Sequence, residues 1–293
     1  MAKNQQLKDA RSQIDEIDGL LLELLNRRAA LAQQVARGKK AELSGLPDDT
    51  EIIYYRPDRE AQVLRRVCDR NQGPFPDRAV RTIYREVISA TLALEQPLKV
   101  AYVEQSDGCA LSSAVAHFGR SAIFLGVEDQ AQALQSVKAG STDVAMIAIG
   151  DRNGELSSQS LARVVSAGVF PIGERWVDGS RHVDQSEQLD TASGPIQLLI
   201  LGRQRCEPTG IDRTLLVVDC GDNSFDEQSL QRMLSTQGQA VCIDAANNRW
   251  CVMVDGHLQD PQVQSWIERL SDRYRSVDPV SSWPAGVKDS RDG

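Results

Sequence analysis

Apolar residues recur at heptad spacing through the first forty residues of the chain. The spacing defines two apolar columns, one with Leu7, Ile14, Leu21 and Val35 and one with Ala10, Ile17, Leu24 and Leu31. Because residues 7–40 are also rich in Leu, Ala, Gln and Arg and contain no proline, they predict one long amphipathic helix. Such a helix is about 50 Å long at about 1.5 Å per residue, and it cannot bury its apolar stripe against itself. We therefore expect it to pack against later helices and against a second copy of the chain.

The pattern of the next fifty residues predicts two shorter helices. Residues 43–50 contain serine, glycine, proline and two aspartates, a composition that is typical of a loop. Helical periodicity resumes over residues 58–71, stops at a segment with one glycine and two prolines, and returns over residues 77–95. Since Pro97 closes this part of the chain, residues 1–96 are expected to form an all-helical domain.

Short apolar runs alternate with helical segments after Pro97, which is typical of an α/β domain. The predicted strands cover residues 98–103, 123–127, 143–149 and 196–201, and the predicted helices cover residues 110–118 and 131–139. Residues 176–194 are polar and are expected to form a loop. This order predicts an open α/β sheet built from residues 97–207.

The last third of the chain predicts a second, smaller unit. Predicted strands at residues 214–219, 240–244 and 250–254 are combined with predicted helices at residues 226–237 and 261–273. This β, α, β, β, α order is typical of a ferredoxin-like half-sandwich, which is expected to span residues 208–280. Residues 281–293 are expected to form a frayed tail.

Charge and composition restrict the partners of the chain. It has 293 residues, a formal net charge of −8 and a hydrophobic share of 41%, which fit a multidomain globular protein without a basic surface for nucleic acid. No apolar run approaches the length of a membrane-spanning helix and no signal peptide is visible, so a cytoplasmic protein is expected. The six cysteines form no Cys-x-x-Cys pair and the three histidines lie far apart, so a structural zinc site is not expected.

Arg28 lies within the apolar seam of the first helix, where a charge needs an anionic partner. Lys39 follows eleven residues later at nearly the same angular position, and Arg11 lies on the same helix. Arg59 and Glu60 come in the first turn of the next helix, so several cations could converge on one small anion. A simpler interpretation stays open, because a seam arginine can set coiled-coil specificity or extend into water, and first-turn charges can merely stabilise a helix end.

These charged residues follow a pattern known from one family. The residues that carry the resemblance are Arg28, Lys39, Arg59 and Glu60. With them, residues 1–96 resemble the helical chorismate mutase domain that opens bifunctional chorismate mutase/prephenate dehydratases. The resemblance implies a homodimer in which two long helices are exchanged between the subunits, so that Arg11 contributes to the site of the other subunit. The positions that match the family's last two substrate contacts are Thr91 and Glu95.

The chemistry that the resemblance implies suits these residue types. The rearrangement of chorismate to prephenate needs no nucleophile, metal or cofactor, so the protein only selects a compact conformer and stabilises the charge that develops. The implied catalytic residues are Arg28, Lys39 and Glu95, and the implied substrate-binding residues are Arg11, Arg59, Glu60 and Thr91. Arginine forks grip carboxylates, Lys39 donates to the ether oxygen, and Glu60 holds the substrate hydroxyl. Glu95 can donate to the ether oxygen only when protonated, so the rate is expected to fall as pH rises through its pKa.

The α/β region resembles the dehydratase domain of the same family much less closely. Residues 104–109 replace the family's glycine-rich segment, and residues 148–152 replace its Pro-Ile/Val-Glu-Asn-Ser segment. The catalytic Thr-Arg-Phe aligns with Ile196, Gln197 and Leu198, so the threonine hydroxyl and the arginine cation are both absent. The region is also shorter than a dehydratase domain by most of its second lobe. We therefore expect dehydratase activity to be lost.

The C-terminal region resembles an ACT domain whose effector-binding motifs are replaced. Residues 226–228 and 244–247 stand where the family has Gly-Ala-Leu and Glu-Ser-Arg-Pro, so control by phenylalanine is not expected. The sequence thus predicts a multidomain α plus α/β protein, a dimeric chorismate mutase of phenylalanine and tyrosine biosynthesis with degenerate dehydratase-like and ACT-like regions. Two alternatives stay open. One is a bifunctional enzyme with a dehydratase site rebuilt from other residues, and the other is a non-catalytic regulatory or binding protein whose helices only dimerise.

Overall fold

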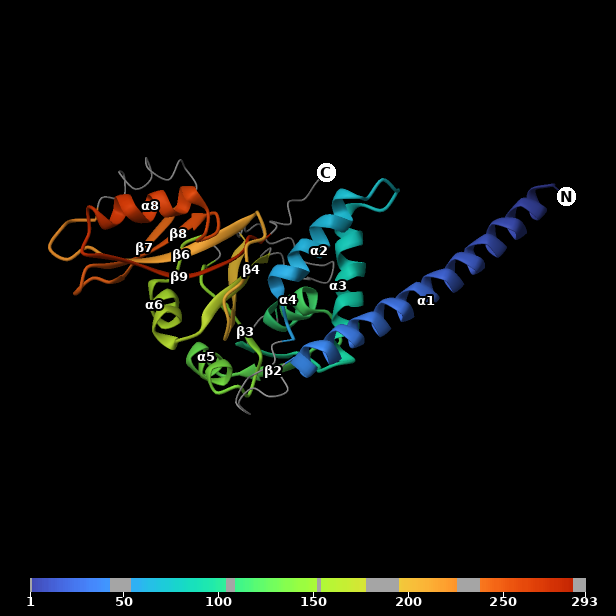
Figure 1. Ribbon diagram of the computed structural model, residues 1–293, viewed down its shortest axis with the longest axis horizontal. Coiled ribbons are helices and arrows are strands. Elements are labelled where there is room, and N and C mark those ends of the chain that lie inside the picture. Colours follow the sequence, from blue (N-terminus) through green and yellow to red (C-terminus); the bar gives the residue numbers. More distant parts are fainter. Residues whose placement is uncertain are drawn as a thin grey trace, which may run out of the picture.

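The computed structural model describes residues 2–42, 54–103, 109–151, 154–177, 195–225 and 238–286. Four stretches named in the sequence analysis lie outside this part of the chain. They are the predicted loop at residues 43–50, residues 104–108 of the replaced segment 104–109, residues 178–194 of the predicted polar loop, and the predicted helix at residues 226–237. Figure 1 shows the described chain as a long helical arm, a pair of shorter helices, and two sheets with helices against them.

Three helices form the N-terminal part of the molecule, as the apolar periodicity predicts. They are α1 (Ala2–Glu42), α2 (Pro57–Asp69) and α3 (Asp77–Ala93). Pro57 occupies the first position of α2, where its missing N–H has no helical partner to lose, and Pro76 immediately precedes α3. Helix α2 packs along α3, whereas α1 reaches α3 through its C-terminal half and extends away from the rest of the chain (Figure 1).

The apolar stripe of α1 is uncovered within one chain. Ten of its large apolar side chains are each at least 43% exposed, namely Leu7, Ile14, Ile17, Leu20, Leu21, Leu22, Leu24, Leu25, Leu31 and Val35. A long amphipathic helix takes most of its stability from packing of this face against another element. An exposed apolar surface of this extent marks an interaction site rather than a solvated face.

The α/β region contains a five-stranded mixed sheet. Its elements are β1 (Lys99–Val103), α4 (Cys109–Phe118), β2 (Ile123–Val127), α5 (Gln130–Lys138), β3 (Val144–Ala148), α6 (Ser158–Ala167), β4 (Phe170–Val177) and β5 (Ile196–Gly202). The strand order is β2-β1-β3-β5-β4, with β1 parallel to β2 and β3, and with β5 antiparallel to β3 and β4. Six of these elements were predicted from the sequence, and each is confirmed with its ends within one residue of the prediction. They are β1, α4, β2, α5, β3 and β5.

Two elements of this region differ from the prediction. The expected loop at residues 176–194 is wrong at its start, because Trp176 and Val177 belong to β4 and pair with β5. Strand β4 contains proline, glycine and two charged residues, so its extended form is set by pairing with the buried strand β5 rather than by its own propensity. Helix α6 is absent from the prediction, although Ser157 caps its first turn by accepting from the N–H of Ser160 and Gly168 ends it with a φ of 74°.

The C-terminal region forms a four-stranded antiparallel sheet. Its elements are β6 (Asp212–Asp219), β7 (Gln239–Asp244), β8 (Arg249–Asp255), α8 (Pro261–Ser271) and β9 (Ser276–Pro284). The strand order β7-β8-β6-β9 is the order of a ferredoxin-like half-sandwich. The expected frayed tail at residues 281–293 is wrong at its start, because Ser281, Ser282 and Trp283 are buried in β9. Because the segment is rich in serine and proline, its sequence does not predict a strand. The strand is stabilised by pairing with β6, which lies more than fifty residues earlier in the chain.

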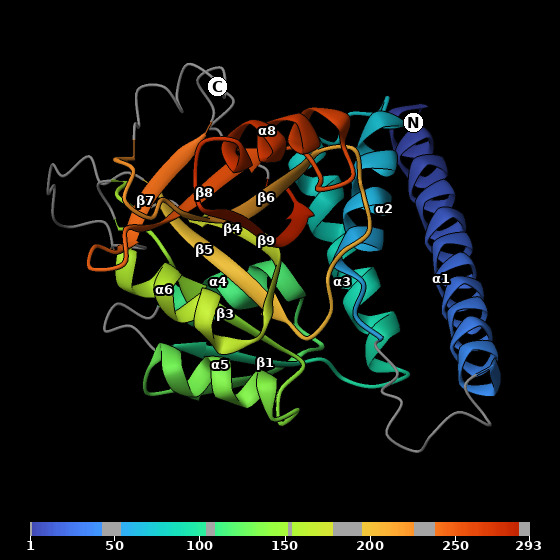
Figure 2. The same ribbon diagram turned by 60° about the vertical axis from the view of Figure 1, so that its left-hand side comes forward.

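The two sheets share one apolar core, and the helical pair is attached to both. Residues of β5 and β6 lie in a single buried cluster with Trp283 of β9, which has no exposed surface. Figure 2 shows the C-terminal sheet stacked on the five-stranded sheet, with α8 on its outer side. On α2, Gln62 Nε2 donates to the carbonyl of Pro208 at 3.3 Å, in the segment that joins the two sheets. This segment therefore holds α2 against the rest of the chain.

Candidate functional site

Arg28 and Thr91 lie 63 positions apart in the sequence and are in direct contact in the structure. Nη1 of Arg28 donates a hydrogen bond of 2.7 Å to Oγ1 of Thr91, and this hydroxyl donates in turn to the carbonyl of Val87 at 2.6 Å. Thr91 is buried and Arg28 is half-buried. The hydroxyl thus fixes one arm of a planar guanidinium that carries five N–H donors, a geometry that suits a carboxylate.

Lys39 and Glu95 lie at the ends of the two helices that carry this pair. Lys39 belongs to the last turns of α1, and its side chain is outside the described part of the structure. Eleven residues of helix separate it from Arg28, which corresponds to about 16 Å along the axis, so two long side chains can reach one ligand between them. Glu95 follows α3 in a turn, one helical turn after Thr91; its N–H donates to the carbonyl of Leu92 at 2.9 Å and its side chain is partly buried.

Arg11 cannot join this group within one chain. It is exposed on α1, and the seventeen residues between it and Arg28 correspond to about 25 Å along the helix axis. A guanidinium on a side chain of about 7 Å does not bridge that distance to a shared small ligand. Its use in the same kind of site requires a second copy of the chain.

Arg59 and Glu60 make no hydrogen bond or ion pair with Arg28 or Thr91 in the described chain. Arg59 is exposed in the first turn of α2. Glu60 lies in a small cavity between α2, α3 and the start of the α/β region, with its Oε1 4.0 Å from Nε of Arg85. Burial raises the pKa of Glu60 to about 7, and the charge of Arg85 opposes this shift.

Arg85 was not among the residues that the sequence singled out. It lies on the side of α3 that also carries Ile88, Ser89 and Leu92, and this side faces Glu60 and the α/β region. Its helical neighbours include Arg81 and Thr82 as well as Ile88 and Leu92, so no apolar seam marks Arg85 in the sequence as one marks Arg28.

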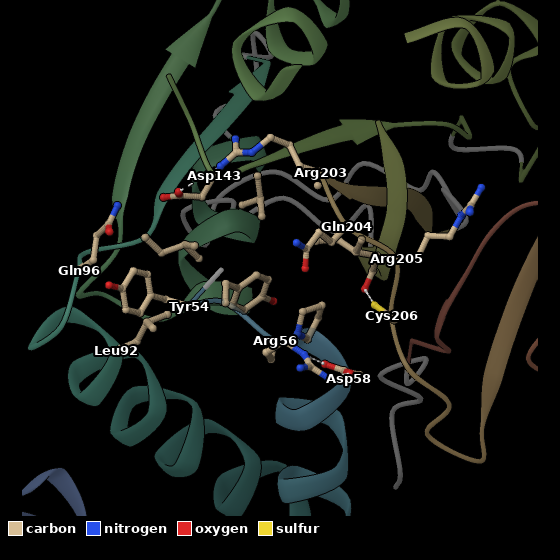
Figure 3. Close-up of a pocket in the computed structure, with 16 residues that line it drawn as sticks. Tyr54, Arg56, Asp58, Leu92, Gln96, Asp143, Arg203, Gln204, Arg205 and Cys206 are labelled. Atoms are coloured by element: carbon tan, nitrogen blue, oxygen red, sulfur yellow. Dashed lines mark hydrogen bonds and ion pairs between the residues drawn. The ribbon is translucent and has the colours of Figure 1, made fainter. Parts of the chain in front are cut away.

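An open cavity separates the helical pair from the five-stranded sheet (Figure 3). Two ion pairs stand on facing walls, Arg56 with Asp58 at 2.6 Å and Arg203 with Asp143 at 3.9 Å. Burial would raise the pKa of Asp58, but hydrogen bonds from the Arg56 guanidinium and the Arg59 N–H outweigh it and hold this pKa below its ordinary value. The charges of Asp58 and Asp143 are thus each balanced by an arginine of the same chain, and the cavity is a polar junction between domains.

The position that resembles the dehydratase's catalytic segment has an apolar face. Ile196 and Leu198 line a cavity at the carboxyl ends of β1 and β3, together with Val103, Met146 and Ala148. Gln197 points to the other face of β5, as strand alternation requires, and its Nε2 donates to a carboxylate oxygen of Glu174 at 3.0 Å. Among the described residues that line this cavity there is no charged side chain.

Neither a membrane-spanning helix nor a metal-binding cluster occurs in the described ranges of the chain. Within them, no helix combines the length and the apolar character that crossing a membrane requires. The same ranges contain no group of three or more His, Cys, Asp or Glu side chains arranged to hold a metal ion.

Comparison with known proteins gives matches over the helical region and over the whole chain. Residues 10–96 match the family described as chorismate mutase type II. The bifunctional chorismate mutase/prephenate dehydratase of Stutzerimonas stutzeri is 36% identical over 367 aligned positions, which cover 98% of this chain and 100% of that protein. The protein of the same description from Neisseria gonorrhoeae is 27% identical, covering 94% of this chain and 96% of its own. Because the first alignment is longer than the 293 residues of this chain, part of that relative has no counterpart here.

Solved structures that align with this chain include two prephenate dehydratases. The one from Arthrobacter aurescens, in complex with L-Phe, is 14% identical, with 64% of this chain and 90% of that chain covered and a TM-score of 0.48. The one from Streptococcus mutans is 12% identical, with 65% and 100% covered and a TM-score of 0.48.

Proposed function

Since the chain belongs to the family of bifunctional chorismate mutase/prephenate dehydratases, we propose that its helical domain isomerises chorismate to prephenate and that its α/β domain does not dehydrate the product. The observation that carries the first half is the hydrogen bond between Arg28 and Thr91. It joins α1 to α3 at two positions implied to hold the substrate, and it orients a guanidinium that would otherwise be free to rotate. A dicarboxylate of the size of chorismate fits the spacing of Arg28 and Lys39.

In this proposal the substrate rearranges within itself and no group passes to the protein. The ether bond breaks as a carbon–carbon bond forms, and negative charge develops on the ether oxygen. Arg28 binds a carboxylate as a fork, while Lys39 and protonated Glu95 donate to the ether oxygen. Arg59 completes the carboxylate site, Thr91 holds the guanidinium of Arg28 in this site, and Glu60 accepts from the substrate hydroxyl.

We propose that the working unit is a homodimer with exchanged α1 helices. Two features of α1 support it, the exposed apolar stripe and the distance of about 25 Å from Arg11 to Arg28. Full burial of one Leu or Ile side chain contributes about 1.5–3 kcal/mol, so covering the ten exposed side chains of the stripe would stabilise the dimer by on the order of 10 kcal/mol. Arg11 would then enter the site of the other subunit.

The proposed loss of dehydratase activity rests on the cavity beneath Ile196 and Leu198, where none of the described lining residues carries a charge. Prephenate carries two carboxylates, and burying them against apolar side chains without a cation is costly. A rebuilt dehydratase site elsewhere in the chain is the second candidate, because the relatives that match nearly the whole chain are described as bifunctional. A purely regulatory or binding role is the third.

The domain limits follow the same proposal. Residues 1–96 would be the mutase, residues 97–207 the dehydratase-like domain, and residues from 208 an ACT-type domain that includes β9 to Pro284. The strand order of the C-terminal sheet supports an ACT-type fold. Residues 244–247, which replace an effector-binding motif, form a turn after β7 in which Asn247 binds the carboxylate of Asp244.

The test is the rate of chorismate loss with the purified chain, compared with Arg28→Ala and with Arg27→Ala as a matched control. Arg27 is the neighbouring arginine on the same helix and is exposed. The proposal predicts that the wild-type chain and Arg27→Ala turn chorismate over and that Arg28→Ala does so at least about a hundredfold more slowly. Equal rates in the two variants, or no turnover by the wild-type chain, would contradict it.

A further inference from the structure

Helix α3 of the helical domain is packed against α4 of the α/β domain without space for an added methyl group. Gly119 ends α4 with a φ of +76°, and a Cβ at this position would lie 2.4 Å from Cβ of Ser89 on α3. One residue later, the N–H of Arg120 donates to the carboxylate of Glu86 at 3.1 Å. The face of α3 opposite to the Arg28 contact is therefore fixed by the α/β domain.

Arg85 spans this junction. Its Nη1 donates to the carbonyl of Ala116 at 3.4 Å, close to the C-terminal end of α4, where the carbonyl groups of a helix favour a cation. Its Nε is buried, has no hydrogen-bond partner in the described chain and lies 4.0 Å from Oε1 of Glu60. Arg85 thus takes its position from α4 and presents a positive charge to the carboxylate on α2.

The side chains around Glu60 offer its carboxylate little stabilisation other than the positive charge of Arg85. The cavity that holds its carboxylate is otherwise lined mainly by apolar and aromatic side chains, among them Leu92 and Phe118. Tyr55 faces Glu60 from the segment before α2, and burial and the negative charge of Glu60 raise the pKa of its hydroxyl well above the ordinary value. On α4, burial and the charges of Arg85 and Arg175 hold the pKa of His117 well below its ordinary value, so this imidazole is neutral and supplies no second cation.

We propose that Arg85 is a positioning residue of the mutase, which holds the carboxylate of Glu60 in place and couples it to helix α4 of the α/β domain. The inference rests on the proposed function, in which Glu60 accepts from the hydroxyl of the substrate. It assigns a role to an α/β domain without a dehydratase site, because that domain supports the substrate-binding face of α2 and α3. An ionised carboxylate is the stronger acceptor, so a cation beside it favours binding.

The first experiment compares pH profiles of kcat/KM on chorismate for the wild-type chain, Arg85→Gln, Arg85→Lys and Arg78→Gln. Arg78 is an exposed arginine on the same helix and serves as the matched control. If loss of the cation raises the pKa of Glu60 from about 7 to about 8, the ionised fraction at neutral pH falls about fivefold. We expect the rising limb of the profile to move to higher pH in Arg85→Gln, to return toward the wild-type position in Arg85→Lys, and to stay unchanged in Arg78→Gln. A profile of Arg85→Gln that superimposes on those of the wild-type chain and Arg78→Gln overturns the inference.

The second experiment disturbs the contact between α3 and α4 by a substitution that changes no charged residue. Gly119→Ala introduces a methyl group against Ser89, whereas Gly154→Ala has the same kind of backbone, with a φ of +80°, and nothing within 4 Å of the added Cβ. Both variants carry the left-handed strain of a non-glycine residue, so only the clash at α3 differs. We expect kcat/KM to fall severalfold more in Gly119→Ala than in Gly154→Ala when both are measured as the folded dimer.

The outcomes separate this inference from the proposed function. A wild-type chain that does not turn over chorismate removes the proposed function and the inference with it. A fully active wild-type chain, with Arg85→Gln and Gly119→Ala as active as their controls, overturns the inference alone. If Arg85→Gln fails to fold, the comparison of Gly119→Ala with Gly154→Ala decides the question.

Discussion

Replacing Asp58 with alanine should destabilise the protein by about 3 kcal/mol near neutral pH. The carboxylate is 2% exposed and accepts four hydrogen bonds. Two come from Arg56 at 3.0 and 2.6 Å, one comes from the N–H of Arg59 at 2.9 Å, and one comes from the N–H of Glu207 at 3.2 Å. Asp58 thereby joins the start of α2 to the segment that connects the two sheets.

The magnitude follows from how well each donor of Asp58 is shielded. The Arg56 side chain is 47% exposed, so its two bonds together contribute only about 0.5–1 kcal/mol after screening by water. The two backbone N–H groups point at a buried charge, and each bond is worth about 1–1.5 kcal/mol, at the low end for charged acceptors. Asparagine keeps the shape and one acceptor oxygen, so Asp58→Asn should cost about half as much as Asp58→Ala.

The pH dependence of this loss has a definite sign. The folded-state pKa of Asp58 lies below its ordinary value, since hydrogen bonds from Arg56 and the Arg59 N–H outweigh the opposing effect of burial. Its contribution is therefore fully present above the pKa of an unfolded aspartate, about 3.9, and is lost as pH falls through the lowered folded-state pKa. The difference in unfolding free energy between the wild-type chain and Asp58→Ala should be constant from about pH 7 to about pH 5 and should shrink below about pH 4.

The assay is urea unfolding followed by far-UV circular dichroism at several pH values. Asp69→Ala is the matched control, because Asp69 is an exposed acid in the last turn of the same helix, where a negative charge contributes no stability. A loss below about 0.5 kcal/mol in Asp58→Ala, or a loss that grows as pH falls, would show that these hydrogen bonds do not stabilise the fold.

Three further predictions concern the proposed mutase. Co-expressing Arg11→Ala with Arg28→Ala chains should restore about a quarter of the wild-type rate, because each mixed dimer contains one intact site; a mixture as inactive as either parent would show that the two arginines serve the same chain. Leu21→Glu places a charge in the exposed stripe of α1 and should give monomers in sedimentation, whereas an unchanged dimer would remove the stripe from the interface. Glu95→Gln should keep its rate on chorismate as pH rises while the wild-type rate falls, and identical profiles would exclude a proton donor role for Glu95.

The local pattern of apolar residues predicts a helix or strand correctly where that pattern itself has the period of the element. The heptad columns of α1 and the apolar runs of β1, β2 and β3 place these elements correctly, because the conformation of each element follows from the pattern of its own residues. Strands β4 and β9 were not predicted correctly, since they contain proline, glycine or serine and owe their extended form to pairing with β5 and β6. Long-range pairing of this kind leaves no periodic signal in the strand itself.

In the candidate site, too, the sequence predicts local features and does not predict those that depend on distant parts of the chain. The place of Arg28 in an apolar seam predicts an anionic partner, whereas its partner in the described chain is the neutral hydroxyl of Thr91 on α3. The environment of Glu60 could not be predicted, because it depends on α4, which follows more than forty residues later. The role of Asp58 in joining α2 to the segment between the sheets could not be predicted either. One of its hydrogen-bond donors, the N–H of Glu207, is 149 positions away in the sequence.

The most direct test of the account is the identity of the product made from chorismate by the purified full chain. Aliquots are quenched and assayed for phenylpyruvate before and after acid treatment, which converts prephenate to phenylpyruvate without an enzyme. We expect prephenate to accumulate in step with the loss of chorismate and phenylpyruvate to be found only after acid. Phenylpyruvate formed before acid would show a working dehydratase, and unchanged chorismate would contradict the mutase itself.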